Sequence, residues 1–396
     1  MIALKGWRSV LRQLCRLHTA VSRASRGLAL TKRGVLRSAA RDKRIFSCET
    51  GVSQASEREE DKSMRRTELD LCRITACVSV ILIHAVSGFF DFSARFSFVM
   101  FLASSLRGFV PLFFMVSGIL YLRREELDPK KTVFPRALRL TALYFVWSAI
   151  YLLGRFAAGQ VSTADELLDL LIQGYYHLWF LPAMVLCTLA LPPVHSMLHG
   201  QKLDPIYPLL LILAYPVLYT TVGYCFSRES KLFQLTRVFN RDFFLYVGYA
   251  LWGAWLDAHP MPKKLRWIAP PVWLLVSALA AAVNIRSSMS KGYVDGVLFD
   301  YFSASTFLQA SAILCFFLTW KDRPSRPGKL LPALSDATLG VYLIHPMLIG
   351  IVEKTGLLPE NMEPLLKLTL LFLILLAVCF PLVMLAKKIP LVRKLM

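Results

Sequence analysis

Two ionisable residues, Arg73 and His84, lie eleven positions apart in an apolar stretch that follows a charged segment. Eleven steps of about 100° place both side chains on one face of an α-helix, and a rise of about 1.5 Å per residue separates them by roughly 16 Å. An imidazole can accept a proton from a hydroxyl group, and a guanidinium can hold an anion. The pair therefore predicts a catalytic base, His84, and a cationic partner, Arg73, that holds an anionic donor.

The depth of His84 in this stretch restricts its surroundings. An ionisable residue far inside an apolar segment is costly in lipid, so it should face protein or a water-filled cavity. The plainer interpretation is a histidine that only hydrogen-bonds a neighbouring helix, although packing gives no reason for Arg73 on the same face. Asp70, one turn before Arg73, is expected either to orient the arginine or to be a solvated flanking residue.

The composition is typical of a membrane protein. Of the 396 residues, 56% are hydrophobic and only 18% are charged. Repeated apolar segments of about 18 residues or more indicate membrane-spanning helices, and weak period-two alternation argues against a barrel. We therefore expect an all-α, polytopic membrane protein with about ten transmembrane helices. The predicted spans are 70–90, 98–122, 138–157, 177–195, 206–224, 243–257, 267–284, 300–320, 334–353 and 364–386.

Basic residues are concentrated in alternate short loops. If the first span enters from the cytosol, the cytosolic loops hold about twice as many Lys and Arg residues as the opposite loops, as the positive-inside rule requires. Both termini are therefore predicted to be cytosolic. The net charge of +20 is explained by this topology, and no nucleic-acid partner is expected. The eight cysteines contain no C-x-x-C pair and predict neither a metal site nor a disulfide framework.

Residues 1–63 differ from the rest of the chain. Twelve Lys and Arg residues precede Ile45, against the single acid Asp42. Such an Arg-rich, acid-poor segment is similar in composition to an organellar transit peptide, and it lacks the apolar core of a secretory signal. We favour a disordered basic arm, or an upstream extension with the natural start at Met64, because residues 64–396 form a self-contained membrane domain.

Arg136 and Arg139 lie at the entrance of the third predicted span, three residues apart and on one helix face. With Lys130 and Lys131 nearby, they form a candidate site for the phosphates of a nucleotide-containing donor. Spacing alone favours the alternative, an ordinary basic anchor on the cytosolic side of a span.

Three further residues are candidates for lining a cavity. Arg107 precedes a helix that Pro111 interrupts, and its alternative is to extend to the outer membrane surface. His177 lies in an aromatic segment typical of a membrane interface, where a histidine is more often structural. His345 lies near the middle of a predicted span, next to Pro346, which frees a backbone carbonyl.

Taken together, these stretches resemble the acyltransferase-3 family of integral-membrane acyltransferases, over about Arg66 to Lys388. The motifs that carry the resemblance are the Arg-x10-His pattern of Arg73 and His84, the FF-x-x-SG-x-L block at Phe113 to Leu120, the pair Arg136 and Arg139, the HLWFLP block at His177 to Pro182, and the YLIHP block at Tyr342 to Pro346. Two residues separate Arg136 from Arg139, where many relatives carry a tighter Arg-x-Arg cluster.

The resemblance implies a multi-pass enzyme of a bacterial-type inner (plasma) membrane, similar to the stand-alone members that acetylate cell-envelope glycans. Its donor substrate would be cytosolic acetyl-CoA or another acyl-CoA, its acceptor a glycan or lipid-linked sugar, and no permanently bound cofactor is expected. By the same resemblance, His84 is the base, Arg73 its essential partner, and Arg136 and Arg139 lie near the donor.

Two alternatives remain open. One is a transporter or flippase for a lipid-linked saccharide, in which His84 and His345 form a proton relay. Paired broken helices in two related halves would favour it, but the sequence shows no convincing internal symmetry. The other is the membrane module of a larger envelope enzyme, such as the membrane part of a serine racemase. The sequence shows no soluble pyridoxal-phosphate domain, which argues against that activity.

Overall fold

The computed structural model describes residues 65–93, 95–159, 174–200, 243–321 and 328–394. These residues form helices and connecting segments, with no strand among them. All of them except Arg65 belong to one compact unit, Arg66–Met396. The predicted basic arm, residues 1–63, lies outside the described residues.

Most of the described residues are α-helical, and short 3-10 or π-helical segments connect some of the helices. The α-helices are α3 (Thr67–Val86), α4 (Phe96–Leu106), α5 (Leu112–Leu122), α6 (Phe134–Ala157), α8 (Phe180–His199), α11 (Phe243–Ala258), α12 (Leu265–Lys291), α13 (Ala304–Leu318), α14 (Leu330–Lys354), α15 (Pro364–Ala386) and α16 (Pro390–Lys394). The short segments are η1 (Ser87–Phe89), η2 (Arg107–Phe109), the π-helix η3 (Pro129–Val133) and η4 (Val297–Phe299).

The all-α prediction is confirmed, and the number of spans is confirmed in part. Within the described ranges, seven helical segments are long and apolar enough to cross a membrane, and each coincides with a predicted span. The predicted spans 243–257 and 300–320 coincide with α11 and α13, which have only 16 and 15 residues. The predicted span 206–224 lies outside the described residues. The membrane orientation and the cytosolic termini stay predictions.

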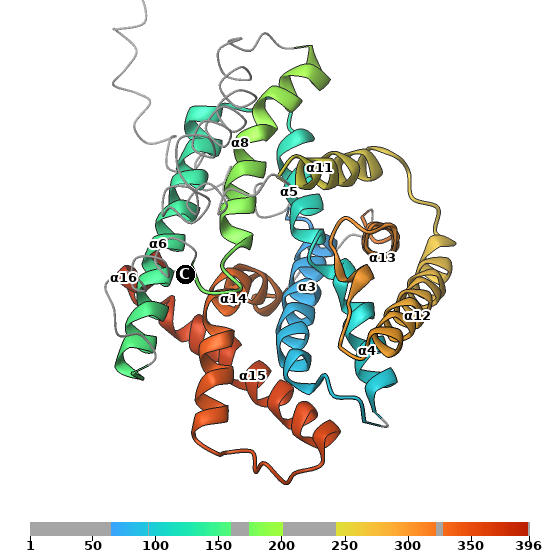
Figure 1. The fold of residues 1–396 in the computed structure, drawn as a ribbon. Coiled ribbons are helices and arrows are strands. Elements are labelled where there is room, and N and C mark those ends of the chain that lie inside the picture. Colours follow the sequence, from blue (N-terminus) through green and yellow to red (C-terminus); the bar gives the residue numbers. More distant parts are fainter. Residues whose placement is uncertain (1–64, 94, 160–173, 201–242, 322–327, 395–396) are drawn as a thin grey trace, which may run out of the picture. The chain divides into compact units, whose positions relative to one another are not determined.

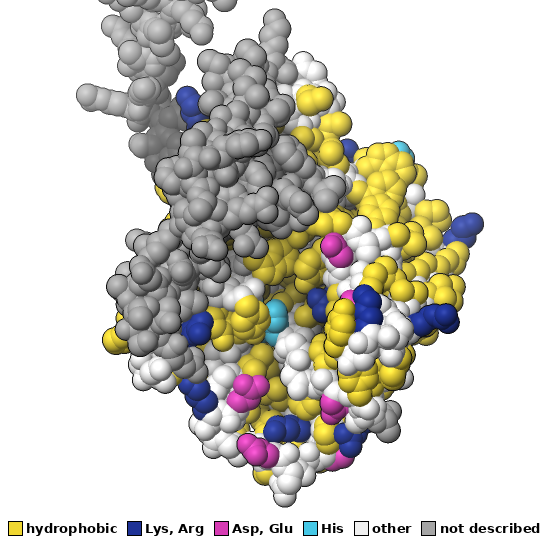
Figure 2. Space-filling model, viewed as in Figure 1, with side chains coloured by type: hydrophobic (Ala, Val, Ile, Leu, Met, Phe, Trp, Pro, Cys, Tyr) yellow, Lys and Arg dark blue, Asp and Glu magenta, His cyan; other side chains and the backbone are white. Residues whose placement is uncertain are grey.

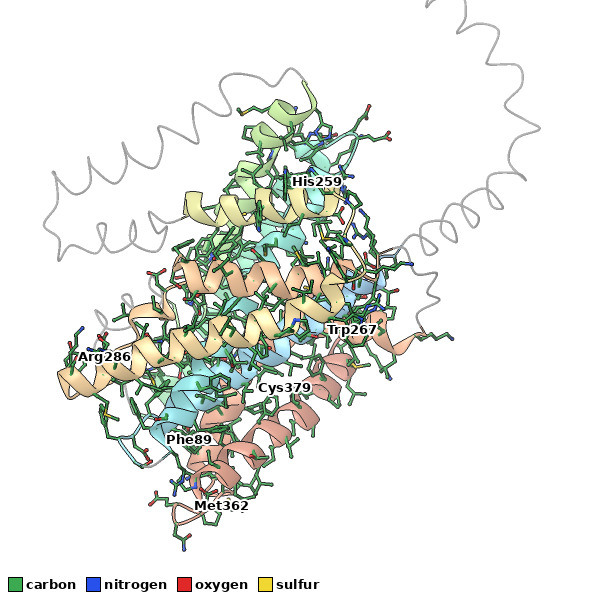
Figure 3. The ribbon with its side chains drawn as sticks, turned by 90° about the vertical axis from the view of Figure 1, so that its right-hand side faces the viewer. Phe89, His259, Trp267, Arg286, Met362 and Cys379 are labelled. Atoms are coloured by element: carbon green, nitrogen blue, oxygen red, sulfur yellow. The ribbon has the colours of Figure 1, made fainter. Side chains whose placement is uncertain are left out.

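Helix α3 lies between other helices and contacts α14, α4, α5, α13 and α15 (Figure 1). Side chains around most of its circumference are buried, including Leu69, Cys77 and Ile81. Figure 3 shows the arrangement from the side, with Trp267 and Arg286 at opposite ends of α12 and Phe89, just after α3, toward the Arg286 end. By the predicted orientation, the Trp267 end is cytosolic.

Helices α3 and α14 run side by side in the same direction. At one end the hydroxyl of Ser335 donates a hydrogen bond to Asp70 at 2.6 Å. Further along, the thiol of Cys77 donates to the carbonyl oxygen of Thr338. Near the other end the rings of His84 and His345 lie 5.0 Å apart. This parallel alignment is what brings two histidines from distant parts of the sequence together.

The second predicted span is interrupted at η2, between α4 and α5. The side chain of Gln309 on α13 accepts a hydrogen bond from the backbone N–H of Gly108, and its amide group donates to the carbonyl oxygen of Ser104 and the hydroxyl of Ser277. These contacts satisfy backbone groups that the interrupted helix would otherwise leave unpaired in an apolar environment. They also fix the turn that carries Arg107.

Helices α5 and α11 cross at backbone contact. A Cβ atom placed on Gly118 would lie 1.8 Å from the carbonyl oxygen of Ala250, and one on Gly253 would lie 2.5 Å from that of Met115. Small residues at such crossings allow membrane helices to approach closely. The glycine of the FF-x-x-SG-x-L block is therefore a packing residue.

At the C-terminal end of α11, the buried carboxylate of Asp257 binds three basic side chains from other parts of the chain. Its oxygens lie 2.7 Å from Arg66, 3.2 Å from Lys321 and 3.5 Å from Arg123. The side chain of Asp257 is only 2% exposed, whereas the three basic side chains are partly exposed. Asp257 thereby links the beginning of α3 to the ends of α5, α11 and α13.

We predict that Gly118→Ala destabilises the protein by about 1–3 kcal/mol, because the new methyl group overlaps the backbone of α11. The measurement is the thermal midpoint of unfolding in detergent. Unfolding is monitored by the reaction of a thiol probe with cysteines that are buried in the folded protein. Gly154→Ala is the matched control, since a Cβ atom at this helical glycine meets nothing within 4 Å. An unchanged midpoint for Gly118→Ala would contradict the close crossing.

We also predict that Asp257→Asn lowers the free energy of unfolding by about 1–3 kcal/mol, less than for a fully buried ion pair because the three cations are partly exposed. The loss should appear as a lower thermal midpoint in the same thiol-probe assay. Glu360→Gln, which removes an exposed carboxylate, should leave the midpoint unchanged. Equal midpoints for the two variants would show that Asp257 does not hold these helices together.

Candidate active site

One cavity of about 790 Å³ lies among α3, α5, α6, α8 and α14. Its wall includes five residues that the sequence analysis singled out: Arg73, His84, Arg136, Arg139 and His177. On the face shown in Figure 2, a histidine side chain lies in a hollow surrounded largely by hydrophobic side chains. The structure therefore brings together residues that lie up to about a hundred positions apart in the sequence.

The residues that line the cavity include five basic side chains. They are Arg73, Arg136, Arg139, Lys387 and Arg393. All five come from helix ends or helix-flanking segments on the predicted cytosolic side: the beginning of α3, the first turns of α6, and the segment after α15. One acidic residue, Asp336, lines the cavity with them. The excess of positive charge suits an anionic ligand with several phosphate groups.

Arg73 and the first turns of α6 are each positioned by a carboxylate. Asp70, which is buried, lies 3.6 Å from the guanidinium of Arg73 and accepts the hydrogen bond from Ser335. Asp128 accepts hydrogen bonds from the backbone N–H groups of Lys130 and Lys131 and so caps η3, the π-helical segment that leads into α6. Asp70 is thus not a solvated flanking residue but orients Arg73.

Lys387 is half-buried at this end of the cavity and donates a hydrogen bond to the carbonyl oxygen of Asp336. Burial lowers the pKa of its ammonium group, and the positive charge of Arg139 acts in the same direction, while Asp336 opposes them. A cation in such surroundings gains from an anionic ligand.

His84 and His177 line the cavity together with aromatic side chains. The ring of His84 lies 5.3 Å from that of Tyr176 and 6.4 Å from that of His177. The aromatic residues of the wall are Phe113, Trp179, Phe180, Tyr301 and Tyr342. The ring of Trp179 stacks on that of Tyr301 at 5.3 Å. The wall around the imidazoles thus offers flat apolar faces beside a few polar groups.

Three residues expected at the cavity do not line it. Asp70 acts through Arg73, as described above. Arg107 places its guanidinium 4.2 Å from the centre of the Phe299 ring, and neither residue lines the cavity. His345 is completely buried, and its ring lies 5.0 Å from that of His84 and 5.6 Å from that of His177.

The sequence analysis did not single out several lining residues. Lys387 and Arg393 lie after the last predicted span, and nothing in their spacing distinguishes them from a basic anchor. Trp179 belongs to the HLWFLP block, which was interpreted as an interfacial aromatic segment. Tyr301 lies at the beginning of the predicted span 300–320, just before α13, and belongs to none of the motifs. Only the packing of the helices shows that these residues meet at one cavity.

Among the described residues, no three His, Cys, Asp or Glu side chains are arranged to hold a metal ion. The polar and aromatic groups of the wall are imidazoles, guanidiniums, one ammonium group, one carboxylate, aromatic rings and the hydroxyls of Ser117, Ser335 and Thr338. A neutral imidazole beside a cavity can act as a general base, and the basic cluster can hold a phosphate-containing substrate.

Comparison with known proteins agrees with the motifs. The family model described as an acyltransferase domain, of the acyltransferase-3 family, matches residues 66–384. An amino-acid racemase from Enterococcus faecalis is 25% identical over 337 residues, which cover 80% of this chain and 45% of the racemase. The chain thus spans less than half the length of this curated relative. No solved structure matches the chain closely enough to count as a relative.

The matched domain covers every residue of the cavity wall up to α15, including the Arg-x10-His pair and the entrance of α6. The chain therefore belongs to the acyltransferase-3 family of membrane proteins.

Proposed function

We propose that this protein is a membrane O-acyltransferase of the inner (plasma) membrane. It moves an acyl group, with acetyl as the first candidate, from cytosolic acyl-CoA to a hydroxyl of a cell-envelope glycan or lipid-linked sugar. The observation that carries this proposal is a single cavity whose wall contains both a cluster of five basic side chains and the imidazole of His84.

The basic cluster supports a nucleotide-containing donor. Coenzyme A carries a pyrophosphate and a further phosphate, and guanidinium groups bind such groups with paired hydrogen bonds. Arg73 and His84 are roughly 16 Å apart along α3, so the donor needs a flexible arm that carries its thioester toward the imidazole. The pantetheine arm of coenzyme A has this character. Arg73 then acts on the donor's charge rather than on the reacting carbonyl.

The aromatic wall near His84 supports a saccharide acceptor. Sugar rings present apolar C–H faces beside hydroxyl groups, and amphipathic aromatic side chains suit such surfaces. Trp179 and Tyr301 supply stacked rings, and His177 places an imidazole in the same wall. The motifs of this chain resemble those of family members that acetylate envelope glycans, and those members use acceptors of this class.

The reaction follows from these positions. His84 removes the proton of the acceptor hydroxyl as the oxygen attacks the thioester carbonyl carbon. The carbon–sulfur bond breaks, an ester forms, and the thiolate of coenzyme A takes the proton from His84. Each turnover consumes one acyl-CoA and one hydroxyl and releases one ester and one free thiol. No covalent acyl-enzyme is required.

We predict that His84→Ala reduces acyl transfer at least about a hundredfold, because it removes the general base. Membranes that contain the wild-type or variant protein are supplied with labelled acetyl-CoA, and the envelope glycans are analysed by mass spectrometry. Detergent-extracted protein must remain folded in both samples. Wild-type turnover by His84→Ala would exclude His84 as the base. Movement of a lipid-linked saccharide across liposomes without acyl-CoA, and without acylation, would instead establish a transporter.

We also predict that the double variant Arg136→Gln/Arg139→Gln raises the KM for acetyl-CoA about tenfold or more and leaves kcat nearly unchanged. Phosphate contacts bind ground state and transition state alike, so their loss weakens binding rather than the chemical step. Steady-state kinetics at several salt concentrations measures both parameters. Arg155→Gln, at the far end of the same helix, is the matched control. Equal KM values for all three proteins would place the donor elsewhere.

A further inference from the structure

His345 is buried and lies outside the proposed reaction. It lies on α14, is 0% exposed and does not line the cavity, although its ring lies 5.0 Å from that of His84 and 5.6 Å from that of His177. A histidine that cannot touch either substrate still influences chemistry if it acts on the residue that does.

The hydrogen bonds of His345 determine which ring nitrogen carries its hydrogen. Nδ1 lies 2.8 Å from the carbonyl oxygen of Tyr342 and 3.3 Å from that of Val341. Carbonyl oxygens only accept hydrogen bonds, so Nδ1 carries the hydrogen in the neutral ring. The other nitrogen, Nε2, therefore has a free lone pair.

This lone pair has no partner in the described part of the chain. Nε2 of His345 is fully buried and makes no hydrogen bond. An unsatisfied polar atom of this kind costs about 1–3 kcal/mol, and buried exceptions of this sort call for a functional explanation.

The nearest imidazole that can supply a donor is His84. The two ring centres are 5.0 Å apart with a 39° angle between the planes. At this separation, a small rotation of either ring brings facing nitrogens within hydrogen-bond distance. Hydrogen bonds of catalytic groups are often long before substrate binds and shorten in the complex.

We propose that His345 is a positioning residue for His84: its Nε2 accepts the N–H of the catalytic imidazole. This inference rests on the proposed function. The hydrogen bond holds His84 in one tautomer, so that its other nitrogen faces the acceptor hydroxyl with a free lone pair. It also stabilises the imidazolium that forms when His84 takes the hydroxyl proton. His345 itself neither gains nor loses a proton.

Other groups also face His84 and do not offer the same arrangement. Arg107, from η2, is a donor only and lies within electrostatic reach of His84. Tyr176 and His177, from the segment before α8, contact the ring of His84. His177 is also buried and neither of its ring nitrogens has a hydrogen-bond partner in the described residues, but its ring lies farther from that of His345, at 5.6 Å. Among these groups, only His345 combines complete burial with a nitrogen whose hydrogen is fixed by the backbone.

The test compares two substitutions of His345 with a matched control. His345→Leu removes the acceptor, whereas the amide oxygen of His345→Gln still reaches the position of Nε2. His259→Gln is the control, because Nδ1 of this exposed histidine also contacts a backbone carbonyl, that of Trp255. We expect kcat to fall about ten- to a hundredfold in His345→Leu, less than on loss of the base itself, with an unchanged KM for acetyl-CoA. His345→Gln should recover most of the loss.

Nitrogen NMR of ¹⁵N-labelled histidine in the purified wild-type protein gives a readout that needs no activity. We expect the Nδ1–H form for His345 and one tautomer for His84, which becomes a mixture of two in His345→Leu. Wild-type kcat and an unchanged His84 tautomer in His345→Leu would overturn the proposal. An Nε2–H form of His345 in the wild type would also overturn it, even if the leucine variant does not fold. Absence of acyl transfer in the wild type itself would refute the proposed function. In that case the tautomers of His84 and His345 would still decide whether the hydrogen bond between them exists.

Discussion

The cost of placing ionisable side chains inside an apolar helix governs the design of this protein. Helix α3 carries Asp70, Arg73 and His84, and each of these requires a partner or an aqueous cavity at its own depth. Helix α14 supplies Ser335 for Asp70, which in turn holds Arg73, and it places His345 next to His84. The parallel packing of these two helices thus compensates the buried polar groups and also assembles the site.

The interrupted second span follows the same constraint. Breaking a helix within a membrane exposes backbone groups that lipid cannot satisfy. Here the side chain of Gln309 accepts the hydrogen bond of the Gly108 N–H, and the break lets Arg107 stack on Phe299. At the predicted cytosolic end, Asp257 forms ion pairs with basic side chains from three segments, and these ion pairs hold the helix ends together.

The cavity has two chemical environments at different positions along α3, one at Arg73 and one at His84. Basic side chains from helix ends form one part of the wall, and imidazoles with aromatic rings form another. Such a division suits a reaction whose charged substrate stays at the cytosolic surface while its reactive group extends inward. In the proposed reaction, the arginine and the histidine, three turns apart on one helix face, therefore act on different substrates.

The sequence by itself determined the helical membrane class and most of the spans, and it singled out five residues that line the cavity: Arg73, His84, Arg136, Arg139 and His177. Hydrophobic length and helical spacing are local properties, so they are readable without a structure. The tertiary structure alone decided that these residues share one cavity, that Lys387 and Arg393 join them, and that Arg107 and His345 stay outside it. Which helix faces meet depends on close crossings such as that of Gly118 with Ala250, and these join residues more than a hundred positions apart. A local sequence pattern cannot predict such a contact, because each of the two residues is an ordinary small residue within its own helix.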